Sequence, residues 1–255
     1  MFLTSSDGTR IAYDVQGKGP TLLLLPGFAE SRRIWYGLGY VEQLLRYFQV
    51  ITMDRRGMGE SDLPTEPSAY AIEKMLDDIC SVADVCGAER FSIWGHSFGG
   101  SQALQLAARS NRISRAIVAG SFFGNVYPDE RIRPMVAELQ KVLTLQGEGQ
   151  LERLGIDPEE QAWFEQRSLP AMIACWQALV SWPVVDPREV RCPLFVYAGS
   201  GDGRVAQPLL ERHQEIEAAG ISLRIFDNLD HEQELSQRDI VFPSAFTFLK
   251  SALVE

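Results

Sequence analysis

The sequence predicts an α/β protein with a mostly parallel central sheet, helices on both faces of the sheet and an inserted helical cap. Three observations support this fold class. Strand-like and helix-like segments alternate along most of the chain, as in parallel βαβ units. The run Thr21–Leu25 is almost wholly apolar, as expected of a strand buried on both faces. A long aromatic and proline-rich stretch, residues 121–186, interrupts the alternation.

The elements follow in order from hydrophobic periodicity and turn residues. The predicted strands are residues 10–15, 21–25, 49–53, 91–94, 113–119, 192–198 and 222–226. The predicted helices are residues 31–48 with breaks, 69–86, 100–108, 204–219 and 239–253. Apolar residues recur at helical intervals through 69–86, and Gly87 is placed to end that helix in a left-handed conformation.

The stretch of residues 121–186 is helical in pattern, and prolines divide it into short helices. Its aromatic residues are Phe122, Phe123, Tyr127, Trp163, Phe164, Trp176 and Trp182. Because it falls between two predicted strands, we expect a helical cap over the carboxyl edge of the sheet. Residues 1–120 and 187–255 would then form the α/β core. The alternative is that residues 121–186 only cover the hydrophobic core and do not form a cap.

Composition excludes several functional classes. The 255-residue chain has a formal net charge of −10 and no basic patch, which argues against nucleic acid or an anionic membrane as partner. The first residues lack the basic and apolar regions of a signal peptide, and apolar runs are only strand-length. The four cysteines lack C-x-x-C spacing, so we expect reduced thiols, no metal site and a cytoplasmic protein.

The most informative motif is the G-x-S-x-G sequence centred on Ser97. It follows the apolar run 91–94 and precedes the helical segment 100–108. Strand, glycine-flanked serine and helix together are typical of a nucleophile elbow, in which a strained turn presents the serine hydroxyl. Gly95 and Gly99 allow close backbone approach, and the helix N-terminus favours a developing oxyanion.

A serine nucleophile needs a base and an acid that orients the base. Of the three histidines, His96 adjoins Ser97 and His213 lies within a polar helical stretch. His231 follows the strand 222–226, at the strand end where α/β active sites form, and is the predicted base. Asp202, in a glycine-rich loop after the strand 192–198, is the predicted acid. The competing acids are Asp129, Asp227 and Asp230.

The oxyanion of an acyl-transfer intermediate needs two convergent backbone N–H groups. Phe98, directly after the nucleophile, supplies the first candidate. The loop that follows Thr21–Leu25 contains Pro26, Gly27 and Phe28, and the Phe28 N–H is the second candidate. In the cap, Trp163 and Trp176 are candidate substrate-binding residues.

With these residues assembled, the whole chain resembles an α/β-hydrolase-fold protein of the serine carboxylesterase type. The resemblance rests on Leu25-Pro26-Gly27-Phe28, on the turn from Asp54 to Asp62, on the elbow, on Ala198-Gly199 through Asp202, and on Asp230-His231. One departure is Pro26, where members of this family often have a histidine that supports the oxyanion loop. Proline also lacks a backbone donor, so this loop has one N–H group fewer for hydrogen bonds.

The resemblance implies hydrolysis of a carboxylic ester through an acyl-enzyme on Ser97, without metal or organic cofactor. A serine at the elbow argues against haloalkane dehalogenases and epoxide hydrolases, which use aspartate there. The aromatic cap suggests a small or medium apolar ester. Lactonase, C–C bond hydrolase and perhydrolase-like activities share the same triad and remain open, as does a ligand-binding receptor on this fold. The sequence leaves the oligomeric state undetermined.

Overall fold

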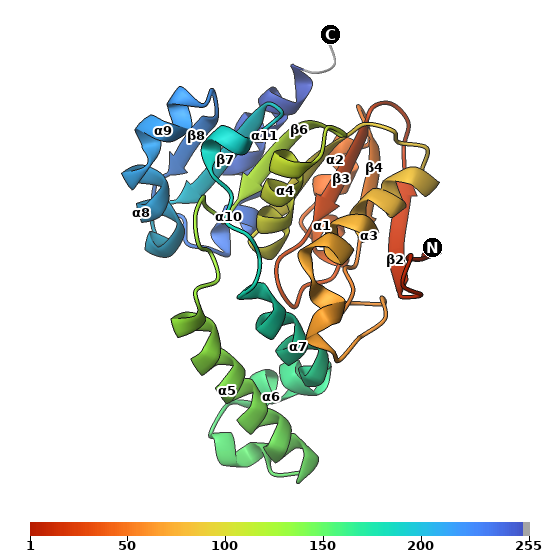
Figure 1. Ribbon diagram of the computed structural model, residues 1–255, viewed down its shortest axis with the longest axis vertical. Helices are drawn as coiled ribbons and strands as arrows, with labels where there is room; N and C mark the ends of the chain where they lie inside the picture. The colour runs from red at the N-terminus through yellow and green to blue at the C-terminus, as the bar shows by residue number, and fades with distance from the viewer. Residues whose placement is uncertain (252–255) are drawn as a thin grey trace.

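The computed structural model describes residues 1–251 and contains one eight-stranded sheet with the order β1-β2-β4-β3-β5-β6-β7-β8 (Figure 1). The strands are β1 (Phe2–Thr4), β2 (Arg10–Gln16), β3 (Thr21–Leu25), β4 (Gln49–Met53), β5 (Phe91–His96), β6 (Ile113–Ala119), β7 (Leu194–Gly199) and β8 (Ser222–Phe226). Only the pairings β1–β2 and β2–β4 are antiparallel, and the remaining strands pair in parallel. The predicted mostly parallel sheet is therefore confirmed.

Helices cover both faces of the sheet. They are α1 (Arg33–Gly37), α2 (Tyr40–Leu44), α3 (Ile72–Val85), α4 (Phe98–Arg109), α5 (Asp129–Gly147), α6 (Pro158–Glu165), α7 (Leu169–Leu179), α8 (Gly203–Glu211), α9 (His213–Ala218), α10 (Gln233–Ser236) and α11 (Arg238–Lys250). Three 3₁₀ turns, η1 (Pro67–Tyr70), η2 (Leu151–Leu154) and η3 (Pro187–Glu189), complete the elements. None of the helices within residues 1–251 is both long enough and apolar enough to cross a membrane.

Two hydrophobic cores lie against the two faces of the sheet. One core packs α3, α4, α8 and α9 on one face, and the other packs α1, α2, α10 and α11 on the opposite face. The central strands β3 and β5 are buried along their whole length, because both of their faces contact helices. This explains why apolar residues predominate in β3 and in the first part of β5.

The segment between β6 and β7 carries α5, η2, α6 and α7, and its two ends meet in an isolated bridge between Gly124 and Val185. In Figure 1 these helices project beyond the end of the sheet as a separate layer. They form a third hydrophobic cluster, which also includes Tyr70 and Phe98 from the sheet-bearing part of the chain. We refer to residues 121–186 as the inserted helices.

Several boundaries differ from the prediction. The short edge strand β1 was not predicted, and the strand predicted at 192–198 begins at Leu194, because Pro193 has no N–H for the ladder. The predicted helix 31–48 is two short helices separated at Gly39, whose φ is 73°. The predicted helix 239–253 begins one residue earlier, and its last two residues lie outside the described part of the chain.

Two other predicted helices are interrupted in the structure, the first of them at residues that make tertiary contacts. In the segment predicted as one helix over 69–86, side chains bind the backbone carbonyls of the first residues. Arg56 donates to the Ala69 carbonyl at 2.7 Å and Trp182 to the Tyr70 carbonyl at 3.0 Å, and α3 starts only at Ile72. The predicted helix 204–219 breaks at Arg212, which has non-helical backbone angles.

Candidate active site

Ser97 lies on a strained turn between β5 and α4. Its φ of 54° and ψ of −114° are unfavourable for a residue with a side chain. Neighbouring backbone permits the turn only because two glycines flank the serine. A Cβ atom on Gly95 would lie 2.0 Å from the Gly99 carbonyl oxygen, and one on Gly99 would lie 2.4 Å from the Leu25 oxygen. Local sequence thus builds the strand–turn–helix geometry that was predicted for the elbow.

The tertiary fold brings Ser97, His231 and Asp202 into one hydrogen-bonded chain. The Ser97 Oγ lies 2.8 Å from His231 Nε2, and His231 Nδ1 lies 2.6 Å from Asp202 Oδ2. Asp202 immediately follows the loop after β7, and His231 lies in the loop after β8. Burial raises the pKa of the Asp202 carboxyl, but the hydrogen bond and charge of His231, together with Arg204, lower it overall below its usual value. Asp202 is therefore ionised at neutral pH.

The competing residues from the sequence lie elsewhere. Asp129 is at the start of α5, where its carboxylate pairs with Arg133. Asp227 and Asp230 are exposed, and Asp230 caps the short helix α10 through Gln233. The structure places His213 at the start of α9, where it is exposed.

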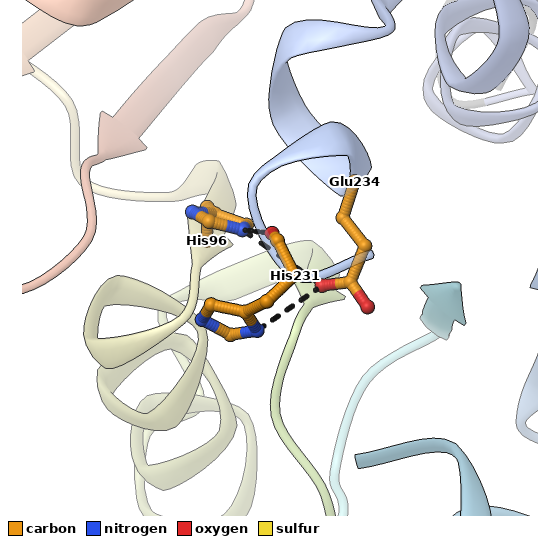
Figure 2. Close-up of side chains that lie close together, drawn as sticks. All are labelled: His96, His231 and Glu234. Atoms are coloured by element: carbon orange, nitrogen blue, oxygen red, sulfur yellow. Dashed lines mark hydrogen bonds and ion pairs between the residues drawn. The ribbon is translucent and has the colours of Figure 1, made fainter. Parts of the chain in front are cut away.

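A second pair of ionisable groups beside His231 was not predicted. Glu234 is fully buried, and its Oε2 lies 3.6 Å from His231 Nδ1 and 3.8 Å from His96 Nε2 (Figure 2). Its other oxygen accepts the Gly199 N–H at 2.7 Å, while Oε2 has no hydrogen-bond partner among the described residues. Burial raises the pKa of Glu234 to about 8. The three-residue spacing from His231, one helical turn, was the available signal.

His96, which adjoins Ser97 in the sequence, lies beside His231. Its ring lies 5.1 Å from the ring of His231, centroid to centroid, and its Nε2 is 3.0 Å from the His231 carbonyl oxygen. Burial, followed by repulsion from His231, lowers the pKa of His96 to about 3. His96 is thus neutral, and its Nε2–H donates to the His231 carbonyl and fixes that loop.

The donor atoms of His96, His231 and Glu234 all lie within 4.8 Å of one another, which makes them the one candidate metal-ligand group among residues 1–251. Two of these donors already have partners. His231 Nδ1 bonds Asp202, and His96 Nε2 bonds a carbonyl. The arrangement is therefore a hydrogen-bonded support for His231.

The loop after β3 is attached to the elbow through Arg55, a residue of the turn from Asp54 to Asp62 for which no role was predicted. The buried Arg55 guanidinium donates to the carbonyls of Pro26 at 2.6 Å and Gly27 at 2.5 Å. It also lies over the Phe98 ring at 4.4 Å. The Gly27 N–H donates to Glu30 at 2.6 Å. These contacts hold the loop that carries Pro26 against the elbow.

The two predicted oxyanion donors are the backbone N–H group of Phe28, in the loop after β3, and that of Phe98, in the elbow. Within residues 1–251, neither the Phe28 nor the Phe98 backbone N–H donates a hydrogen bond to the protein. The two phenyl rings are 5.6 Å apart, and both residues line the same cavity as Ser97. Both N–H groups therefore remain available to a bound molecule.

Ser97 and His231 open into a cavity of about 230 Å³. The inserted helices supply its opposite wall, including Trp176, which is buried and packs on Phe28 with ring centroids 4.4 Å apart. Trp163 does not reach this cavity. It lines a neighbouring pocket of about 700 Å³, with which the Ser97 cavity shares Phe28, Met135 and Trp176. Trp176 therefore lines both cavities, whereas Trp163 lines only the larger one.

Comparison with known proteins identifies the family. The model of the alpha/beta hydrolase fold family matches residues 20–147. The chain belongs to this family. An uncharacterised protein of Mycobacterium tuberculosis is 33% identical to this α/β-hydrolase over 145 residues, which are 54% of this chain and 41% of that protein. The match thus spans less than half the length of that curated relative.

Solved structures resemble this α/β-hydrolase over nearly its whole length. The esterase of Exiguobacterium antarcticum has a TM-score of 0.79 and 21% identity, with 98% of this chain and 99% of that chain covered. The enol-lactonase of Burkholderia xenovorans LB400 has a TM-score of 0.76 and 20% identity, with 98% and 100% covered. At these identities the likeness shows the shared fold.

Proposed function

We propose that this protein is a serine hydrolase that cleaves carboxylic esters of small or medium apolar substrates through an acyl-enzyme on Ser97. The observation that carries the proposal is the Ser97–His231–Asp202 chain, with distances of 2.8 Å and 2.6 Å at the end of a strained elbow. Nucleophile, base and orienting acid in hydrogen-bond contact are what acyl transfer requires. The fold family and its esterase and lactonase relatives support a hydrolase.

In the proposed mechanism, Ser97 Oγ attacks the ester carbonyl while His231 Nε2 takes its proton. The ionised Asp202 holds the proton on Nδ1 and stabilises the imidazolium that forms. The N–H groups of Phe28 and Phe98 bind the oxyanion. His231 then protonates the leaving alcohol, and a water molecule, deprotonated by His231, releases the acid from Ser97.

Glu234 and His96 would tune His231 without taking part in proton transfer. With a pKa of about 8, Glu234 is mainly protonated at neutral pH, so Asp202 is the carboxylate that faces His231 Nδ1. With a pKa of about 3, His96 is neutral and adds no positive charge beside the imidazolium. This environment favours transient protonation of His231 during the reaction.

The inserted helices are proposed to act as the cap that selects the substrate. The cavity of about 230 Å³ is smaller than the pockets that hold drug-sized ligands, which begin at roughly 300 Å³. Its wall of Phe28, Tyr127 and Trp176 is aromatic. We expect Trp176→Ala to shift the acyl-chain preference toward longer esters, whereas an unchanged preference would remove Trp176 from the binding site.

The test is hydrolysis of 4-nitrophenyl esters of increasing chain length by the wild-type protein, Ser97→Ala and Ser110→Ala. Ser110 ends α4, at the opposite end of the helix from Ser97, and serves as the matched control. Turnover in the wild type and in Ser110→Ala that disappears in Ser97→Ala is expected. Turnover that survives in Ser97→Ala would refute the acyl-enzyme on Ser97. Absence of turnover in all three would direct the search to lactone, C–C bond or peroxide chemistry, and then to a receptor role.

A further inference from the structure

The wall of the Ser97 cavity contains two arginines that the proposed mechanism does not use. Arg131 lies in the first turn of α5, and Arg204 lies in the first turn of α8. Arg131 is partly buried, and the one hydrogen bond of its side chain within the described residues is a 3.3 Å contact to the Val126 carbonyl. No carboxylate of residues 1–251 lies within ion-pair distance of Arg131.

The lack of a carboxylate partner is notable in a chain with a net charge of −10. The buried guanidinium of Arg32 binds Asp14 and Asp54, and that of Arg56 binds Asp7 and Asp78. Arg131 instead shares the wall of its cavity with a second cation, Arg204. Burial, followed by repulsion from Arg204, lowers the pKa of Arg131. An anion bound between the two arginines would relieve this repulsion.

Arg204 can also contribute to such a site. Its side chain is 46% exposed, and its Nε lies 4.0 Å from Asp202 Oδ1, at the limit of an ion pair. Asp202 is already hydrogen-bonded to His231, so the guanidinium of Arg204 retains donors for another group. Since Asp202 offsets part of the positive charge, the pair of arginines matches a singly charged carboxylate better than a doubly charged phosphate.

We infer that the substrate of this protein carries a carboxylate, which Arg131 and Arg204 bind while the ester carbonyl lies at Ser97. The inference rests on the proposed hydrolase function and names its substrate class. The rest of the cavity includes Phe122, Val126 and Met135, so the part of the substrate that joins the two groups is apolar. Half-esters or lactones of aliphatic dicarboxylic acids have this chemistry.

The test compares acidic and neutral esters of matched length. On the acyl side, mono-4-nitrophenyl adipate is compared with 4-nitrophenyl hexanoate. On the leaving-group side, 3-carboxy-4-nitrophenyl butyrate is compared with 4-nitrophenyl butyrate. The readout is the acidic-to-neutral ratio of kcat/KM, measured for each variant and divided by the wild-type ratio, which cancels the intrinsic reactivity of each ester.

Three variants separate the subsite from general effects. We expect Arg131→Met to lower the acidic-to-neutral ratio of kcat/KM at least about tenfold in one of the two ester pairs, which is the loss expected for one charge-assisted hydrogen bond. The change should appear mainly in KM. Arg131→Lys should restore part of it. Arg133→Met, two residues away on the same helix with a 79% exposed side chain, is the control and should leave the ratio unchanged. In the wild type, the ratio should fall as ionic strength rises, a readout independent of any variant.

Binding to Ser97→Ala separates failure of this inference from failure of the proposed function. Calorimetric titration of that variant with each ester measures recognition without turnover. Preference for the acidic ester that Arg131→Met removes supports the inference, even if no ester is hydrolysed by the wild type. Serine-dependent turnover with equal ratios in wild type and Arg131→Met, and no salt dependence, overturns the inference while the hydrolase function stands. Equal binding of acidic and neutral esters without turnover overturns both.

Discussion

Replacing Glu234 with glutamine should change the pH dependence of stability, because this buried carboxyl is neutral in the folded protein. Its pKa is about 8 in the folded state, against an ordinary value of 4.5. Between these values the folded state retains a proton that the unfolded state has released. The stabilisation that this group contributes is therefore complete below pH 4.5. It declines as the pH rises above 4.5 and is lost once the pH has passed through 8.

The magnitude follows from the same two values. Each pH unit in this interval costs 1.36 kcal/mol, so the interval of roughly 3.5 units corresponds to about 5 kcal/mol. A glutamine at position 234 can still accept the Gly199 N–H but cannot ionise. The free energy of unfolding of Glu234→Gln should therefore rise relative to the wild type by about 4 kcal/mol between pH 4.5 and pH 8, because the carboxyl is half titrated at each end of this interval.

The assay is equilibrium unfolding in urea, followed by tryptophan fluorescence, at each pH from 4.5 to 8.5. Groups common to both proteins titrate equally and cancel in the difference between the two unfolding free energies. Glu232→Gln, an exposed carboxyl two residues away, is the matched control and should show a difference that does not vary with pH. If the difference for Glu234→Gln varied by less than about 1 kcal/mol over this range, the assignment of Glu234 as a neutral buried acid would be wrong.

Three further predictions test the supports of the site. Asp202→Asn should lower kcat for a hydrolysed ester on the order of 10⁴-fold, the loss known for this change in a serine protease triad, and steady-state kinetics would show a smaller effect if another group orients the histidine. Arg55→Met removes a donor from two loop carbonyls and should lower the free energy of unfolding by about 2–4 kcal/mol, together with kcat, whereas an unchanged thermal midpoint would contradict this role. Gly120→Ala should destabilise the fold by about 1–3 kcal/mol, since φ is 62° and the new Cβ would lie 2.5 Å from Glu234 Oε2. Gly147→Ala, which meets no neighbouring atom within 4 Å, should cause no such loss in the same denaturation experiment.

The fold class and most of the strands could be predicted from the order of residues along the chain. The apolar runs of β3 and β5 are local signals, because a strand covered by helices on both faces has no polar alternation. The elbow was equally readable, since strand, glycine-flanked serine and helix are consecutive in the chain. His231 and Asp202 could be selected by their position after predicted strands, because the carboxyl ends of parallel strands meet at one edge of a sheet.

The environment of these residues depends on how separate elements pack together, which the sequence does not show. Glu234 contacts His96 across more than a hundred residues of sequence, and the charge state of both depends on burial, which periodicity does not show for a polar residue in a loop or a short helix. Arg131 and Arg204 share a cavity wall because α5 and α8 approach the same strand ends. Such contacts arise from the packing of elements that are far apart in the sequence. The catalytic residue types could therefore be predicted from short motifs, but the charges around them and the lining of the substrate pocket could not.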